Sequence, residues 1–99
     1  MALLPQDEID AALAGDLSGW SQAGDTLTRE VEAPSFLAGI RLVQHVAEVA
    51  EELDHHPDID IRWRTLTFTA ATHSAGGVTV KDVELAGRID SIVATAQAG

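Results

Sequence analysis

The chain has 99 residues, 45% of them hydrophobic, and its 16 acidic and six basic side chains give a net charge of −10. This length and composition predict one compact domain over residues 1–99, with no separate ligand-binding lobe. So negative a charge argues against nucleic acid and membranes as partners, although solubility alone would also explain it. The absence of cysteine excludes disulfides, thiolate nucleophiles and zinc sites that rely on sulfur.

The N-terminal segment and the hydropathy pattern bear on where the protein works. Residues 1–5 contain no basic side chain, and Asp7 and Glu8 interrupt the apolar run well short of the length of a signal sequence. No stretch approaches the ~20 apolar residues that span a bilayer. Together with the lack of cysteine, these features favour a cytoplasmic protein.

Helix signals give way to strand signals over the first third of the chain. A short helix is expected between Pro5 and Gly15, and its apolar residues stand at helical spacing: Ile9, Ala12 and Leu13. Between residues 19 and 33, apolar and polar residues alternate around a Gly24-Asp25 turn, which predicts a β-hairpin.

The strongest helix signal begins at Pro34-Ser35. Apolar residues then recur at intervals of three and four and form one broad face: Phe36, Leu37, Ile40, Val43, Val46, Ala47, Ala50 and Leu53. The segment His55-His56-Pro57 ends this helix, because proline disfavours helical geometry in the residue before it.

Strand signals return after Pro57 and a last helix follows them. Ile59, Ile61 and Trp63 alternate with charged residues, and a second apolar series up to Ala70 alternates with threonines, which predicts two strands or one long bent strand. After the Gly76-Gly77 break, Thr79 is placed to cap a helix with these apolar positions: Val80, Val83, Leu85, Ala86, Ile89, Ile92, Val93 and Ala96.

The order of these elements predicts an α+β fold. Two amphipathic helices facing a small sheet make a two-layer sandwich, with a four-stranded antiparallel sheet and helices on one face in the order α-β-β-α-β-β-α. A core of this size gains stability from association, so we expect a homo-oligomer.

Three of the four histidines fall at predicted element ends, where side chains reach solvent and substrate: His55, His56 and His73. An imidazole has an unperturbed pKa of about 6.5 and, when positioned as an acid or base, contributes typically ~10²–10⁴-fold to a rate. Two of them could form an acid–base pair, with carboxylates to orient the rings: Glu51, Asp54 and Asp82.

Each of these residues also has a structural interpretation. His55 or His56 could cap the carbonyls at the end of the helix. Thr79 and Asp82 have the spacing of a capping box, so Asp82 could simply close a helix end. Trp20 and Trp63 would by default lie in the core. Glu51 and Glu52 would be solvated, and His45 would be an ordinary surface or boundary residue of the helix.

Other kinds of site fit the sequence less well. Adjacent His55 and His56 would need unusual backbone geometry to hold one ion, and no His-x-x-x-His pair is present, so we expect no metal. Ser74 lacks the context of a nucleophile elbow. Gly76-Gly77 does not form a dinucleotide fingerprint, because no Gly-x-Gly-x-x-Gly pattern follows a strand here.

The joint spacing of the candidate residues is more specific than any one of them. Glu51 is followed after three residues by His55-His56-Pro57, and then come Trp63, His73 and Asp82 after gaps of five, nine and eight residues. This pattern resembles the signature of the pterin-4a-carbinolamine dehydratases, also called dimerisation cofactors of a homeodomain transcription factor. The resemblance covers nearly the whole chain, and it departs from the family mainly at the N-terminal helix and around residues 33–35.

This resemblance implies a fold, an assembly and a reaction. The family has a β-β-α-β-β-α core with an extra N-terminal helix, and it forms dimers or tetramers. Its members remove water from 4a-hydroxytetrahydropterin to give quinonoid dihydropterin without a cofactor. A reductase normally recycles this product after aromatic amino-acid hydroxylases have used the tetrahydropterin, which makes such a hydroxylase a possible pathway partner in tetrahydrobiopterin recycling.

The resemblance also assigns roles to residues of this chain. His55 and His73 match positions proposed as acid and base, and His56 matches one that mainly holds the substrate. The positions expected to contact the pterin are matched by Asp54, Ala71 and Thr72. Trp20 matches an aromatic residue of the pocket wall, and Glu51 and Asp82 match acids that we expect to orient other groups. The sequence does not decide which histidine is the acid.

A different class of function remains open on the same scaffold. Resembling proteins include a transcriptional dimerisation cofactor and relatives that assist the assembly of a carbon-fixing enzyme, and functions are grafted onto folds. A pure binding or assembly factor would not need three histidines, and this chain retains His55, His56 and His73. Catalysis is therefore the favoured interpretation.

Overall fold

A four-stranded antiparallel sheet forms one layer of the fold in a computed structural model that describes residues 1–98, with side chains described up to residue 96. The strands lie in the order β1-β2-β4-β3, and their bounds are β1 (Ser21–Ala23), β2 (Thr26–Glu32), β3 (Asp58–Arg62) and β4 (Thr65–Ala70). The central pair, β2 and β4, runs in register from Leu27 opposite Ala70 to Glu32 opposite Thr65. The predicted hairpin and the two separate later strands are confirmed.

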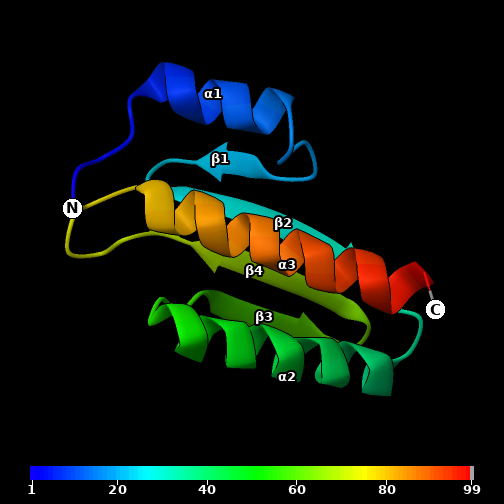
Figure 1. The fold of residues 1–99 in the computed structure, drawn as a ribbon. Coiled ribbons are helices and arrows are strands. Elements are labelled where there is room, and N and C mark those ends of the chain that lie inside the picture. The colour runs from blue at the N-terminus through cyan, green and yellow to red at the C-terminus, as the bar shows by residue number, and fades with distance from the viewer. Residues whose placement is uncertain (99) are drawn as a thin grey trace.

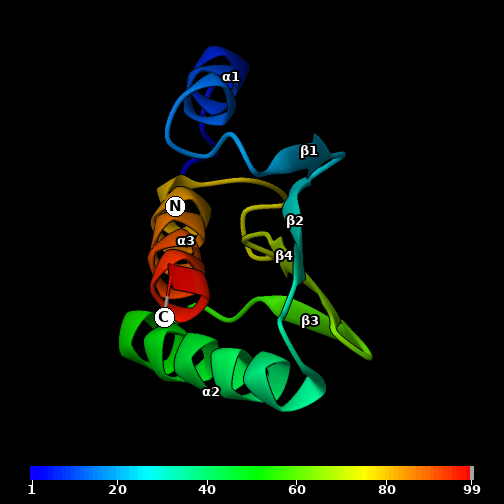
Figure 2. The same ribbon diagram turned by 90° about the vertical axis from the view of Figure 1, so that its right-hand side faces the viewer.

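Three helices form the other layer: α1 (Gln6–Ala14), α2 (Phe36–Leu53) and α3 (Val80–Ala98). Figure 2 shows all three on the same side of the sheet, with α3 between the other two. The predicted fold class and the α-β-β-α-β-β-α order are confirmed. No helix within residues 1–98 is long and apolar enough to cross a membrane.

The core lies between the sheet and the helices. Alternate residues of β4 are buried (Leu66, Phe68 and Ala70), while the threonines between them lie on the opposite, partly exposed face. This is the period of two that a strand imposes when one face is covered. From α3, Leu85 and Ile89 close the core with no exposed surface.

The apolar face of α2 is only partly buried. Ser35 caps its start, since the hydroxyl accepts a hydrogen bond from the Ala38 N–H at 3.0 Å. Leu42, Val46 and Ala50 are buried, but other apolar residues of the predicted face are exposed: Phe36, Leu37 and Ile40. The broad apolar stripe is therefore wider than the surface that the sheet and α3 cover.

The two tryptophans differ in their environments. Trp20 is in the core, as its structural interpretation predicted, with 4% of its surface exposed. The core interpretation of Trp63 is wrong, because this side chain is 72% exposed. The alternating pattern of β3 continues in the sequence beyond its end at Arg62, but Trp63 already belongs to the β3–β4 turn, where it has a φ of +52°. Its ring lies 4.7 Å from the guanidinium of Arg64.

Candidate active site

The three predicted histidines meet in one pocket of about 340 Å³. It lies where the end of α2, the segment after β4 and the first turn of α3 come together, at the left of Figure 1. Its lining residues are Asp54, His55, His56, Ala71, Thr72, His73, Ser74 and Lys81. Residues up to 27 positions apart in the sequence thus share one cavity.

The end of α2 delivers His55 and His56 to the pocket. The helix ends before His55-His56-Pro57, as predicted, but Asp54 rather than Pro57 closes it. Asp54 adopts the left-handed conformation at φ 49° and ψ 44°, and the His55 N–H then donates to the Ala50 carbonyl at 3.0 Å. These are the features of a Schellman-type C-cap, with aspartate in the place that glycine usually takes. Neither imidazole caps the helix. The chain turns away from the helix axis after Asp54, and both imidazoles line the pocket.

His55 is held from behind by a buried carboxylate. Its Nε2 lies 2.6 Å from Oδ1 of Asp82, which has no exposed surface. The other oxygen, Oδ2, accepts hydrogen bonds from the Thr79 N–H and the Thr72 hydroxyl, both at 2.8 Å. Asp82 therefore closes the capping box at the start of α3 and at the same time contacts an imidazole of the pocket.

His56 has a more exposed partner. Its Nε2 lies 3.1 Å from Oε2 of Glu51, and the side chains are 56% and 79% exposed. Glu51 and Glu52 are solvated, as their structural interpretation predicted. An exposed pair of this kind contributes little stability, typically ~0–1 kcal/mol. The contact can nevertheless bias the direction in which the His56 ring points.

His73 lies on the short loop that links β4 to α3. The Thr72 N–H donates to the Gly77 carbonyl at 2.9 Å, which closes the loop, and Gly76 takes a φ of +77° that favours glycine. The imidazole of His73 is exposed and makes no hydrogen bond to another residue of the described chain. It is thus the histidine of the pocket whose ring is least constrained.

The predicted site residues fall into three groups. The three histidines, Asp54, Ala71 and Thr72 line the pocket, whereas Glu51 and Asp82 stand behind its imidazoles. Trp20 is not among the lining residues, because it is buried in the core and its Nε1–H donates to Asp90 Oδ1 at 2.8 Å. The structure thus places Trp20 in the core and not among the residues that line this pocket.

Three residues of the site were not identified from the sequence. Ser74 and Lys81 line the pocket, and Thr79 connects to it through Thr72. Ser74 follows His73 directly and Lys81 precedes Asp82, so adjacency to signature residues was the available signal. Thr79 was assigned only a capping role, since nothing in a linear sequence shows that its hydroxyl meets that of Thr72.

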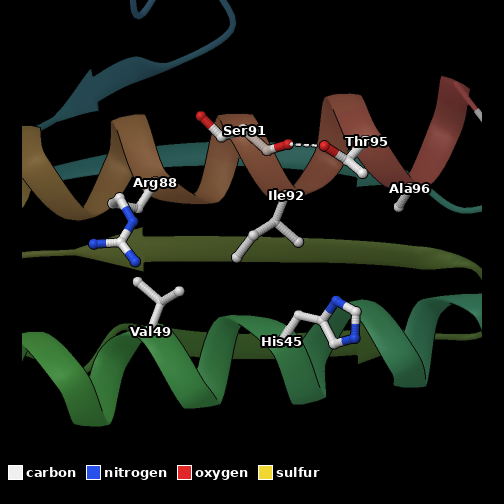
Figure 3. A pocket seen from close by; sticks show the side chains of 7 residues that line it. All are labelled: His45, Val49, Arg88, Ser91, Ile92, Thr95 and Ala96. Atoms are coloured by element: carbon white, nitrogen blue, oxygen red, sulfur yellow. Dashed lines mark hydrogen bonds between the residues drawn. The ribbon is translucent and has the colours of Figure 1, made fainter.

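A second groove, of about 300 Å³, runs between α2 and α3. Figure 3 shows Ile92 of α3 pointing into it towards Val49 and His45 of α2. Its polar side chains have other partners: the Thr95 hydroxyl donates to the Ser91 carbonyl at 3.0 Å, and Arg88 pairs with Glu52 at 3.0 Å. His45 is exposed, as predicted, and among the described residues that line the groove it is the only histidine or acid. The histidine pocket is therefore the better candidate for acid–base chemistry.

Metal binding finds no support in the geometry of the described residues. Within residues 1–98, no three His, Asp or Glu side chains are arranged so that they could hold one ion. His55 and His56 instead direct their Nε2 atoms to different carboxylates, Asp82 and Glu51. Imidazoles gathered in one pocket are the kind of groups that general acid–base chemistry uses.

Known proteins share this sequence pattern over nearly its full length. Residues 2–92 match the sequence profile of the family described as pterin 4 alpha carbinolamine dehydratase. A relative from Mycolicibacterium smegmatis, whose name suggests a pterin-4-alpha-carbinolamine dehydratase, is 57% identical over 93 residues, which cover 94% of this chain and 98% of the relative. A relative from Mycobacteroides abscessus with the same name is 59% identical over 91 residues, covering 92% and 96%.

Solved structures share the fold. The crystal structure of a transcriptional coactivator/pterin dehydratase from Brucella melitensis matches with a TM-score of 0.87 and 31% identity, covering 92% of this chain and 98% of that one. A pterin dehydratase-like protein described as a RuBisCO assembly factor in the alpha-carboxysome matches with a TM-score of 0.62 over 75% of this chain and 86% of its own, at 16% identity. At that identity the second likeness concerns the fold alone.

Proposed function

Because the chain belongs to the pterin-4a-carbinolamine dehydratase family, we propose that it removes water from 4a-hydroxytetrahydropterins to give quinonoid dihydropterins. The observation that carries this proposal is the convergence of His55, His56 and His73 on one pocket. A protein that only bound a partner would not need three imidazoles there, two of them paired with carboxylates.

The reaction needs two proton transfers. The hydroxyl on C4a leaves as water, which requires a proton donor, and a ring nitrogen loses its proton, which requires an acceptor. In this proposal His55 and His73 provide the acid and the base, while His56, Asp54, Ala71 and Thr72 hold the pterin. No electron is transferred, so the proposed chemistry requires no redox cofactor.

The proposed substrate suggests a place for the reaction. A 4a-hydroxytetrahydropterin arises when a tetrahydropterin-dependent hydroxylase uses its pterin, and the dehydrated product must then be reduced again. We therefore propose a cytoplasmic role in tetrahydrobiopterin recycling, with such a hydroxylase as the supplier of substrate.

Exposed apolar side chains support a further part of the proposal, that copies of this chain associate. Phe36, Leu37 and Trp63 are 52%, 57% and 72% exposed, and Ile40 and Ile61 are 37% and 40% exposed. The backbone hydrogen bond from the Ala33 N–H to the Arg64 carbonyl, at 2.8 Å, ties the start of α2 to the turn that holds Trp63. A gathering of exposed large apolar residues is typical of an interface between subunits.

The deciding experiment is stopped-flow absorbance on chemically generated 4a-hydroxytetrahydropterin. The wild-type chain should accelerate the decay over the spontaneous rate in proportion to enzyme concentration. If the decay stays at its spontaneous rate while the protein is folded, dehydration is the wrong function and the alternative, a non-catalytic binding or assembly factor on the same scaffold, takes its place.

A further inference from the structure

Two buried threonines behind the pocket, Thr72 and Thr79, form a chain of hydroxyl groups that leads to Asp82. We infer that these threonines are positioning residues, which hold Asp82 so that His55 keeps its hydrogen on Nε2 and offers Nδ1 to the pocket as the proton acceptor. The catalytic consequence rests on the proposed function, whereas the protonation pattern of His55 does not.

The directions of the hydrogen bonds follow from counting hydrogens. The Thr72 Oγ1 lies 2.8 Å from Oδ2 of Asp82 and 2.7 Å from Oγ1 of Thr79, and both threonines are buried, at 7% and 0% exposure. A hydroxyl has one hydrogen to donate, and an ionised carboxylate only accepts. The Thr72 hydrogen therefore goes to Asp82, and the Thr79 hydroxyl donates to Thr72.

The same counting determines the tautomer of His55. Oδ2 of Asp82 already accepts from the Thr79 N–H, which can only donate, and from the Thr72 hydroxyl. Oδ1 is left for Nε2 of His55 at 2.6 Å, so with Asp82 ionised the hydrogen between them belongs to Nε2. In the neutral ring Nδ1 then has a free lone pair, and it is the one polar side-chain atom of His55 that no described residue uses.

This pattern separates the roles of the histidines. When substrate binds, Nδ1 of His55 accepts the proton of a pterin ring nitrogen, and the electron pair of that N–H bond forms the new C=N bond to C4a. The C4a–O bond breaks with its own pair, and the departing hydroxide takes a proton from the protonated imidazole of His73 to leave as water. Protons and electrons balance without a further reagent.

A purely structural role for the threonines makes a different prediction. Thr79 also accepts from the Lys81 N–H at 3.3 Å, and Asp82 closes the capping box, so this cluster stabilises the start of α3. If that were its whole role, removing a hydroxyl would lower stability but would leave the His55 tautomer and the turnover of the folded protein unchanged.

The test uses nitrogen-15 NMR of histidine-labelled protein, with His55 assigned by its loss in His55→Gln. In the wild type, Nε2 should give the shift of a protonated nitrogen and Nδ1 that of an unprotonated one. Thr72→Val should mix the two tautomers, whereas Thr72→Ser should keep the wild-type pattern. The matched control is Thr67→Val, which removes a hydroxyl from the neighbouring strand β4 on the face of the sheet away from the helices.

Kinetics on the same variants supply the second readout. Thr72→Val should lower kcat at least about fivefold, and Thr72→Ser should restore it, as expected for a group that acts through the base. KM should change little, because the Thr72 hydroxyl donates to Asp82 and the proposed contact of Thr72 with the pterin is left to its backbone. A wild-type His55 with its hydrogen on Nδ1 overturns the inference, and so does a Thr72→Val protein that matches Thr67→Val in both tautomer and kcat. If the wild type fails to accelerate dehydration, the proposed function fails, but the NMR comparison still decides the positioning role.

Discussion

The two ends of the sheet present opposite kinds of surface. At the end where α2 stops and α3 begins, titratable side chains surround a pocket, and a fully buried carboxylate with several hydrogen-bond donors stands behind one of them. At the other end, where α2 begins beside the β3–β4 turn, large apolar side chains are exposed without a covering element among the described residues. At the polar end, hydrogen bonds within the chain hold two of the imidazoles. At the apolar end, large hydrophobic side chains remain exposed to solvent.

The difference follows from the kinds of force that act at each end. Hydrogen bonds are directional, so Asp82 can determine which nitrogen of His55 faces the pocket. Apolar burial has no such direction, and the end with Phe36 and Trp63 gains free energy from any well-fitting cover. We therefore expect changes at the first end to alter catalysis and changes at the second to alter association.

The largest effect is expected from Asp82→Asn. An amide in this place must turn its NH₂ group towards either His55 or the Thr79 N–H, which removes an acceptor and disturbs the tautomer or the cap. We predict a loss in kcat of at least about 10² in the stopped-flow assay, within the range of general acid–base catalysis. The free energy of unfolding should fall by about 1–3 kcal/mol, since a buried donor loses its partner. A kcat within threefold of wild type would show that this carboxylate serves the fold alone.

His73→Ala tests the freest imidazole of the pocket. Its ring is exposed and has no partner within the described chain, so its removal should change the free energy of unfolding by no more than about 0.5 kcal/mol. We predict that dehydration slows at least about tenfold, as expected for loss of an acid or base. Denaturant unfolding gives the control value, and an unchanged dehydration rate would remove His73 from the mechanism.

The contrast between the two ends also explains what the sequence could predict. Periods of two and 3.6 gave the strands and helices, and capping residues such as Ser35 and Thr79 marked where helices begin. Local pattern carries this information because local backbone geometry produces it. Trp63 was misplaced because an alternating pattern does not show that its strand has already ended in a turn.

The sequence predicted which residues belong to the site, but not the hydrogen bonds that join them. The spacing from Glu51 to Asp82 identified the pocket histidines, yet the bonds that join Asp82, Thr72 and Thr79 form only when separate elements meet. Trp20 shows that a match to a family position does not by itself determine where a side chain lies. A residue that matches a family position was buried against Asp90, because its own neighbours in this fold determine where its ring goes.

At the apolar end we predict that Phe36→Glu weakens self-association. Phe36 is the first residue of α2, where an acidic side chain suits the helix dipole, so the helix should persist while a charge appears on the proposed interface. The dissociation constant of the assembly, from sedimentation velocity, should rise at least about fivefold, which corresponds to about 1 kcal/mol. Gln44→Glu adds the same charge at another exposed position of α2 and is the matched control. Equal effects of the two variants would mean that charge, rather than loss of the apolar contact, controls assembly.

Glu51→Gln should have the smallest effect, and it tests how far the polar end depends on burial. The Glu51 contact with His56 resembles that of Asp82 with His55 in chemistry, but both of its members are more than half exposed. Water can replace Glu51 as the partner of the ring, so kcat should fall less than about threefold, and any change should appear mainly in KM because His56 is proposed to hold the pterin. A loss in kcat as large as that of Asp82→Asn would show that a carboxylate acts here by orienting its histidine, whether or not the pair is buried. Glu48→Gln, one helical turn earlier on the exposed surface of α2, separates the contact from the general loss of one negative charge.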